Sequence, residues 1–201
     1  MIYLIRHGQT VLNREGRYQG RIDSALTPLG VAQAEAIGRR LAALHDADPG
    51  DWRLEVSPLG RALETARIIG EIAGLGPAVV DERLIEADYG DFEGLTREEV
   101  DARWPEFIGL ESTFGRAPGG ETMEALWARC RPWLADHAEP GVRTVAVSHA
   151  STGRVLRGLY LGLSLEETRR LDRPQDAFHL LHEGKVTRHE AGPLPSPTPG
   201  A

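Results

Sequence analysis

The chain has 201 residues, of which 41% are hydrophobic and 26% charged, and its formal net charge is -7. This length and composition predict one globular domain with a substantial core, and an acidic balance without a long basic run argues against nucleic-acid binding. The single cysteine, Cys130, excludes an intrachain disulfide and a cysteine-based metal site, and we expect it to be a small core residue. Because the sequence shows no signal-peptide pattern and no apolar run of membrane-spanning length, we expect a cytoplasmic protein without a membrane partner.

Strand-like and helix-like segments alternate along the chain. The apolar run at 2–5 predicts the first strand, Thr27 is expected to cap a helix that begins at Pro28, and Ser57 with Pro58 to cap and open another. Further strands are expected at 53–56, 78–80 and 144–148, helices at 59–73, 97–104, 121–137 and 152–161, and a terminal hairpin at 176–181 and 185–189. The alternation predicts an α/β fold, a three-layer sandwich with a mostly parallel central sheet flanked by helices.

The chain shows no internal repeat and no linker, so we expect residues 1–191 to form a single domain. Residues 192–201 contain four prolines and little that could be buried. We therefore expect them to form a disordered tail.

A cation and a nucleophile follow the first strand directly. Arg6 offers a forked donor for a phosphoryl group, and a neutral His7 offers a nitrogen nucleophile. Gly8 ends the strand, and we interpret it as leaving room for a ligand to approach the backbone. This combination at the carboxyl end of a strand indicates phosphate chemistry.

A second strand, 144–147, is followed by Ser148 and His149. In a mostly parallel sheet the carboxyl ends of the strands share one edge, and ligands bind outside that edge. We therefore expect His7 and His149 to lie together there. Arg61, near the start of the helix that follows the 53–56 strand, should point to the same edge.

The acid candidate is Glu86, in the loop at 84–94. A leaving oxygen requires a proton, so a carboxylic acid within hydrogen-bond reach is needed. The spacing alone does not separate Glu86 from Asp88, Asp91 or Glu93.

The ordered motifs, up to about residue 190, resemble the histidine phosphatase superfamily, also called phosphoglycerate mutase-like. They are Arg6-His7-Gly8-Gln9-Thr10 with Asn13, Gln19-Gly20, Leu26-Thr27-Pro28-Leu29-Gly30 with Gln33-Ala34, Ser57-Pro58-Leu59-Gly60-Arg61-Ala62 with Glu64-Thr65-Ala66, the Glu86 loop with Gly90-Asp91-Phe92-Glu93-Gly94, Gly119-Gly120-Glu121-Thr122, and Val147-Ser148-His149.

The resemblance implies a role for each of eight residues. His7 would be the nucleophile, and Glu86 would protonate the leaving oxygen and later activate water or a second hydroxyl. The phosphoryl oxygens would be held by Arg6, Arg61 and His149 with help from Asn13, and Gln19 and Gly20 would lie near the rest of the substrate. These cations should disfavour protonation of His7 and stabilise the charge of the transferring phosphoryl group.

We expect no metal and no other cofactor, because no Asp, His and Glu set shows the spacing of a metal site. The resemblance thus implies a metal-independent phosphomonoesterase that acts on a small phosphorylated metabolite through a phosphohistidine intermediate. Two alternatives stay open: phosphoglycerate mutase-type phosphoryl transfer, and a non-catalytic phospho-ligand binder on the same fold.

Two motifs favour the phosphatase branch over the mutases. Gln9 stands where family mutases tend to carry Glu, and Ala150-Ser151 follow the late histidine where they tend to carry Gly-Asn. A mutase also needs extra cations for a substrate carboxylate, and the segment at 94–120 has three separate arginines and no lysine.

The segment at about 91–122 is expected to form a lid over the site. Its aromatic residues Trp104, Phe107 and Phe114, together with Tyr89, either pack within the lid or contact an organic leaving group. The open edges of the expected sheet permit a homodimer without predicting one.

Overall fold

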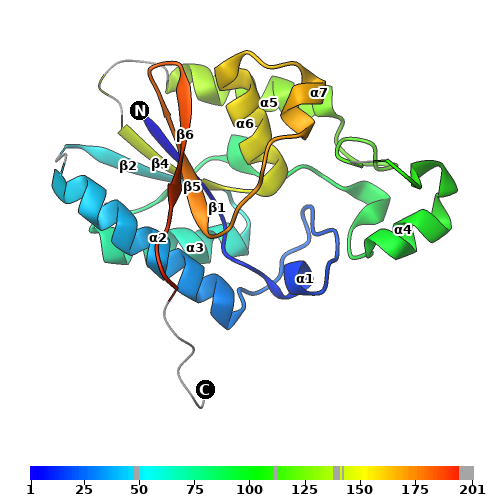
Figure 1. Cartoon of the computed structure of the whole chain (residues 1–201), viewed down its shortest axis with the longest axis horizontal. Helices are drawn as coiled ribbons and strands as arrows, with labels where there is room; N and C mark the ends of the chain where they lie inside the picture. Colours follow the sequence, from blue (N-terminus) through cyan, green and yellow to red (C-terminus); the bar gives the residue numbers. More distant parts are fainter. Residues whose placement is uncertain (48–49, 111–112, 138–140, 142, 195–201) are drawn as a thin grey trace.

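A computed structural model describes residues 1–47, 50–110, 113–137, 141 and 143–194 (Figure 1). A six-stranded sheet, in the order β3-β2-β4-β1-β5-β6, runs through the middle of the molecule. The strands are β1 (Ile2–Arg6), β2 (Trp52–Val56), β3 (Val79–Val80), β4 (Arg143–Ser148), β5 (Ala177–His182) and β6 (Lys185–Glu190). The β1–β4, β2–β4 and β2–β3 pairs are parallel, whereas β5 pairs antiparallel with β1 and with β6. The sheet is mixed but mostly parallel, as predicted.

Helices cover both faces of this sheet. α2 (Pro28–Ala47) and α3 (Gly60–Ala73) lie on one face, and α5 (Met123–Asp136) and α6 (Ala150–Leu161) lie on the other (Figure 1). In β1, Tyr3 and Ile5 pack into the first core, whereas Ile2 and Leu4 pack into the second. Successive side chains of a strand point to opposite faces, so a strand covered on both sides must be apolar throughout. The predicted three-layer α/β sandwich is confirmed.

Shorter elements connect these layers. They are α1 (Val11–Arg14), α4 (Arg97–Arg103), α7 (Leu165–Arg169) and the 3-10 turns η1 (Glu82–Leu84), η2 (Gly90–Phe92) and η3 (Pro105–Phe107). The expected lid segment, apart from residues 111–112, contains η2, α4 and η3, and α4 lies away from the sheet (Figure 1).

A small aromatic cluster holds this segment together. The fully buried Phe92 ring lies 5.1 Å from the Trp104 ring and 5.3 Å from the Phe107 ring. Trp104 and Phe107 therefore pack within the segment, the first of the two alternatives above. Closure of the segment over a ligand stays a prediction.

Two helix starts differ from the sequence-based expectation. α3 begins at Gly60 with Leu59 as N-cap, so Ser57 is not its capping residue. α6 begins at Ala150 directly after β4, two residues earlier than its periodicity predicts, with His149 as N-cap. Thr27 behaves as expected, because its Oγ1 accepts a hydrogen bond from the backbone N–H of Gly30 at 3.1 Å.

Gly8 is required by packing rather than by a ligand. A Cβ at Gly8 would lie 2.2 Å from the carbonyl oxygen of Gly30, in the first turn of α2. A Cβ at Gly30 would in turn lie 2.1 Å from the carbonyl oxygen of Gln9. The two glycines let α2 begin in direct backbone contact with the chain that leaves β1.

The remaining sequence-based expectations have mixed outcomes. Cys130 is fully buried in the core formed with α5 and α6, as expected. Within the described ranges, no helix combines the length and apolarity needed to cross a bilayer. Of the expected tail, residues 195–201 lie outside the described residues, and the single-domain division at 191 stays a prediction.

Candidate active site

Three parallel strands end side by side and bring three polar residues together. His7 follows β1, Ser57 follows β2 and His149 follows β4. The backbone N–H of His7 donates to the Ser148 carbonyl at 3.0 Å, and that of Ser57 donates to the Val147 carbonyl at 3.0 Å. These bonds continue the sheet one residue beyond its strands and fix the three residues at its carboxyl edge.

A cavity of about 780 Å³ opens at this edge. Seven of the eight predicted site residues line it: Arg6, His7, Asn13, Gln19, Gly20, Arg61 and Glu86. The eighth, His149, is buried next to His7, with 5.1 Å between the two ring centroids. The structure thus brings together residues from six separate segments, and their roles in a reaction stay predictions.

The ring of His7 is held in one tautomer by its two neighbours. Nδ1 lies 2.8 Å from the carbonyl oxygen of Gly8, which can only accept, so Nδ1 carries the proton. Arg61 Nε donates to His7 Nε2 at 3.2 Å, so Nε2 presents a lone pair. Burial, then Arg61 and Arg6, lower the pKa of His7 well below its usual 6.5, so the imidazole is neutral and nucleophilic at neutral pH.

Arg61 is fixed by backbone carbonyls rather than by a strong ion pair. It is 2% exposed, and its NH1 and NH2 donate to the carbonyls of Ile22 at 2.9 Å and Gly20 at 2.7 Å. Asp23 lies 3.6 Å away and is half exposed. The guanidinium is therefore oriented at His7 while much of its charge stays available to a phosphoryl group.

Arg6 is the second arginine whose charge lowers the pKa of His7. Its NH1 donates to the carbonyl of Arg173 at 2.7 Å, and its buried Nε has no hydrogen-bond partner within the described residues. Burial and the nearby charge of Arg173 lower the pKa of Arg6 to about 10, so it remains a cation at neutral pH.

His149 has one engaged nitrogen and one without a partner. Nε2 lies 2.6 Å from Ser57 Oγ, whereas the buried Nδ1 makes no hydrogen bond within the described part of the chain. Burial and the neighbouring His7, Arg61 and Arg6 lower the pKa of His149 well below 6.5, so this ring is also neutral. Nδ1 is therefore the nitrogen that remains for a phosphoryl oxygen. Ala150, which follows, is the first residue of α6 and needs no positive φ.

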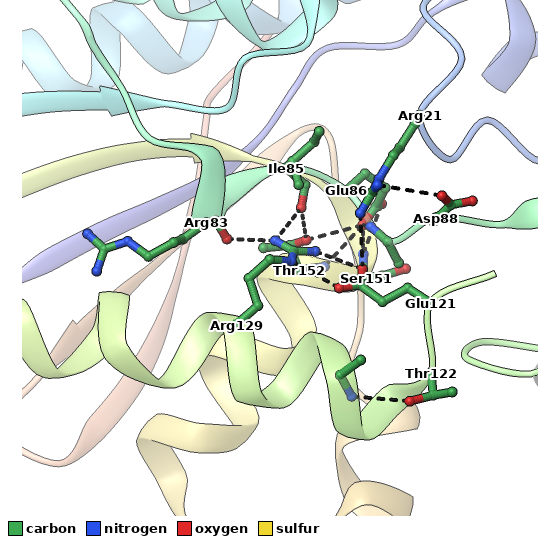
Figure 2. Close-up of polar contacts among 12 residues, drawn as sticks. Arg21, Arg83, Ile85, Glu86, Asp88, Glu121, Thr122, Arg129, Ser151 and Thr152 are labelled. Carbon is green, nitrogen blue, oxygen red and sulfur yellow. Dashed lines mark hydrogen bonds and ion pairs between the residues drawn. The ribbon is translucent and has the colours of Figure 1, made fainter.

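Glu86 is buried against the start of α6 (Figure 2). Its carboxylate accepts backbone hydrogen bonds from Ser151 at 3.1 Å and from Thr152 at 3.1 Å. The backbone N–H of Ala87 adds a third bond at 2.9 Å. The helix that follows His149 thus fixes the position of the Glu86 carboxylate.

The other three acids of this loop do not line the cavity. Asp88 forms an ion pair with Arg21 at 3.5 Å, and Glu93 accepts from the backbone N–H of Arg21 at 2.7 Å. Of these four acids, Glu86 alone lines the cavity, a distinction that spacing left open. Its role as the acid stays a prediction.

Asn13, Gln19 and Gly20 form one wall of the cavity. Asn13 Nδ2 donates to Gln19 Oε1 at 3.3 Å, and the buried Gln19 Nε2 has no partner among the described residues. Gly20 has a φ of +52°, a backbone conformation that strains any residue with a Cβ, and a Cβ there would lie 2.0 Å from Glu93 Oε1. This wall can offer amide donors to a substrate.

Within the described residues, His, Cys, Asp and Glu side chains form no group of three that could hold a metal ion. The expectation that catalysis needs no metal or other cofactor stays a prediction.

Comparison with known proteins identifies the family. The sequence profile of the histidine phosphatase superfamily (branch 1) matches residues 2–185. The chain belongs to this superfamily. It is also 38% identical to "Probable phosphoglycerate mutase GpmB" of Enterobacter sp. (strain 638) over 177 residues, which cover 85% of this chain and 79% of that protein.

Solved structures of histidine phosphatase-fold proteins resemble the whole chain. A mycobacterial glucosyl-3-phosphoglycerate phosphatase, in complex with VO3, has a TM-score of 0.76 and 29% identity and covers 97% of this chain and 99% of its own. The alpha-ribazole phosphatase of Shigella flexneri has a TM-score of 0.70, covers 100% of this chain and 98% of its own, and at 24% identity supports the fold alone.

Several residues at this histidine phosphatase site were missed by sequence reasoning. Ser57 directly follows a strand, as His7 does, and the same signal could have identified it. Gln175 Nε2 donates to the His7 carbonyl at 3.1 Å and to Asn13 Oδ1 at 3.1 Å. Arg154 and Arg173 also line the cavity. Nothing in their spacing relates these last three residues to the strand ends.

Proposed function

We propose that this protein is a metal-independent phosphomonoesterase that acts on a small phosphorylated metabolite through a phosphohistidine intermediate. The observation that carries the proposal is the state of His7, which is neutral, with its lone pair on Nε2 and with the charges of Arg61 and Arg6 nearby. A fixed nitrogen nucleophile among cations matches the requirements of phosphoryl transfer, where positioning and charge stabilisation supply most of the catalysis.

The proposed reaction has two steps. First, the Nε2 lone pair of His7 bonds to phosphorus, the bond from phosphorus to the ester oxygen breaks, and that oxygen takes a proton from Glu86. Arg61 Nε must leave Nε2 at this point and donate to a phosphoryl oxygen instead. Second, Glu86 takes a proton from water, whose oxygen bonds to phosphorus as the N–P bond breaks, releasing inorganic phosphate and restoring His7.

A mutase is the second candidate. It is supported by the 38% identity to relatives named as probable phosphoglycerate mutases. In a mutase the second step would return the phosphoryl group to a hydroxyl of the reoriented substrate rather than to water.

The test is phosphate release from p-nitrophenyl phosphate, fructose phosphates, 3-phosphoglycerate and nucleotides in excess EDTA. We expect turnover by the wild type, loss of turnover in His7→Ala, and unchanged turnover in His182→Ala, a matched control on the exposed end of β5. After reaction with a phosphate ester labelled in its phosphoryl group, acid-labile label bound to the wild-type protein but not to His7→Ala would identify the phosphohistidine intermediate.

Two other results would favour the alternative functions. Interconversion of phosphoglycerates without phosphate release would favour the mutase. Binding of phosphoesters without either reaction would favour the non-catalytic binder.

A further inference from the structure

The cavity has far more positive charge than a single phosphoryl group needs. Nine arginines line it, against two carboxylates, Glu86 and Glu166. Arg6 and Arg61 lie beside His7 and suffice for the phosphoryl position described above. The remaining arginines extend the cationic wall away from the nucleophile, and two of them, Arg154 and Arg173, have unusual surroundings.

Arg154, on α6, is buried without a counter-ion. It is 5% exposed, its NH1 donates to the carbonyl of Arg169 at 2.9 Å, and its guanidinium lies 4.8 Å from the centre of the Phe114 ring. Its buried Nε has no hydrogen-bond partner in the described part of the chain. No carboxylate of the described residues forms an ion pair with it. A buried, unpaired cation is costly and requires an anion to compensate it.

Arg157, one turn further along α6, shows the usual arrangement. Its NH1 forms an ion pair with Asp172 at 2.5 Å. The same helix and the same loop thus pair one buried arginine with a carboxylate and leave the other, which faces the cavity, without an ion pair among the described residues.

Arg173 lies beside Arg154, in the loop after α7. Its side chain is exposed and, among the described residues, forms no ion pair. Burial, then Arg173 and Arg157, lower the pKa of Arg154, whereas Tyr89 and Glu86 raise it. Arg173 also lowers the pKa of Arg6. The three cations are therefore close enough to repel one another, and an anion between them would relieve that repulsion.

These cations do not act directly on the nucleophile. The charges that lower the pKa of His7 are those of Arg61 and Arg6, whereas Arg154 and Arg173 act on Arg6 and Tyr89. The cavity of about 780 Å³ has room for more than a phosphoryl group. Arg154 and Arg173 thus line the same cavity as Arg6, and their charges act on Arg6 rather than on His7.

We propose that Arg154 and Arg173 form a second anion-binding subsite, and that the substrate carries a second anionic group, a carboxylate or a phosphate, besides its scissile phosphoryl group. The inference rests on the proposed function, because it takes the phosphoryl group at His7 as its reference point. The cations proposed here for the second anion lie between α6 and β5, outside the segment at 94–120 whose arginines were considered above for a substrate carboxylate.

The test compares pairs of ligands that differ in the second anionic group. Glycerol 3-phosphate is compared with 3-phosphoglycerate for a carboxylate, and fructose 1-phosphate with fructose 1,6-bisphosphate for a phosphate. Dissociation constants are measured by calorimetry in the His7→Ala background, which needs no turnover, and kcat/KM is measured in parallel with His7 intact.

In at least one pair, we expect the ligand with the second anionic group to bind roughly ten- to a hundred-fold more tightly than the ligand without it, as is typical of charge-assisted hydrogen bonds. Arg154→Gln or Arg173→Gln should reduce this preference to about three-fold or less while changing the affinity of the partner ligand little. Arg173 is exposed, so its variant keeps the test valid if Arg154→Gln fails to fold. The matched control is Arg67→Gln, an exposed arginine of α3 paired with Glu64 and Glu71.

Three results would overturn the subsite: equal affinities within both pairs, a preference that persists in both variants, or an equal loss in Arg67→Gln. The arms also separate the two proposals. A binding preference that depends on Arg154 and Arg173, without hydrolysis of any ester, would refute the phosphatase and support the subsite. Hydrolysis of an ester without such a binding preference would support the phosphatase and refute the subsite.

Discussion

At the scale of single residues, the site depends on which nitrogen of each histidine is engaged. Gly8 and Arg61 fix the tautomer of His7, and Ser57 lies against Nε2 of His149. Ser57 Oγ also lies 3.4 Å from the backbone N–H of Leu59, which donates to it. If the hydroxyl in turn donates to Nε2, the proton of neutral His149 stays on Nδ1, where it can be donated to a phosphoryl oxygen.

This arrangement predicts the effect of Ser57→Ala. We expect kcat/KM to fall roughly five-fold, corresponding to about 1 kcal/mol for one hydrogen bond, while the fold is retained. Steady-state kinetics and circular dichroism measure the two effects. Thr187→Ala, which removes a hydroxyl from the exposed strand β6, is the control, and wild-type kinetics in Ser57→Ala would contradict the role.

At the scale of elements, helices on one face of the sheet hold the loop that carries Glu86. Arg129 of α5 donates to the carbonyls of Arg83 at 2.7 Å and Ile85 at 3.0 Å, and pairs with Glu121 at 2.9 Å (Figure 2). α5 thus fixes the backbone on one side of Glu86, and the start of α6 fixes its carboxylate on the other.

Arg129→Gln should therefore displace Glu86 while leaving the residues around the proposed phosphoryl position in place. We expect kcat to fall about ten-fold with little change in KM, and stability to fall by about 1–3 kcal/mol. Urea unfolding and steady-state kinetics test this expectation. Arg131→Gln, on an exposed position of the same helix, should match the wild type, and an Arg129→Gln enzyme with wild-type kcat would refute the positioning role.

A second contact between elements makes stability depend on pH. His137 Nε2, at the end of α5, lies 2.8 Å from Glu55 Oε1 of β2, and Trp133 Nε1 donates to Glu55 Oε2 at 2.9 Å. Burial opposes both charges, but the hydrogen bonds outweigh it, so the pKa of His137 is raised above 6.5 and that of Glu55 is lowered below 4.5. Asp81 raises the pKa of Glu55, and Arg83 lowers that of His137.

The sign of the effect follows from these directions. The His137 contribution is complete below pH 6.5 and is lost as the pH rises through its raised pKa, whereas the Glu55 contribution is complete above pH 4.5 and is lost as the pH falls. His137→Gln should therefore lower the free energy of unfolding most between pH 4.5 and pH 6.5, and less at alkaline pH. Urea unfolding across this range tests it. A cost that does not vary with pH would contradict it, and the exposed His182→Gln should change stability by less than about 0.5 kcal/mol throughout.

At the scale of the whole molecule, the site exists because the layers meet closely at the carboxyl edge of the sheet. Gly8 and Gly30 let α2 begin against the chain that leaves β1, directly beside His7. This contact joins the first helical layer to the sheet at the point where His7 is held.

Gly8→Ala should disturb that junction. Its Cβ would lie 2.2 Å from a backbone oxygen that cannot move without shifting α2, so we expect a loss of about 1–3 kcal/mol and reduced activity. Gly153→Ala is the matched control, because its Cβ would meet only Leu4 Cδ2 at 4.0 Å within a helix; it should be neutral or stabilise by up to about 1 kcal/mol. Thermal unfolding measures both. Equal melting temperatures for Gly8→Ala and the wild type would contradict the packing argument.

The sequence by itself determined the fold class, the longer helices and the strands to within two residues at their ends, and the residues at the strand ends, including His7 and His149. It could do so because apolar runs, turn residues and strand termini are local properties of the chain, and the parallel sheet then places the strand termini at one edge. The expected convergence of Arg61 on this edge follows from the same rule, since α3 begins directly there.

Only the tertiary structure decided what depends on contacts between distant segments. It placed Glu86, alone of four acids, in the wall of the cavity, where its carboxylate accepts from the backbone N–H groups of α6. It also placed Ser57 against His149 rather than at a helix cap. It also brought Arg154 and Arg173 to the cavity from the α6–β5 region. The physical reason is the same in each case: hydrogen bonds, burial and uncompensated charge are set by neighbours in space, which local sequence patterns do not specify.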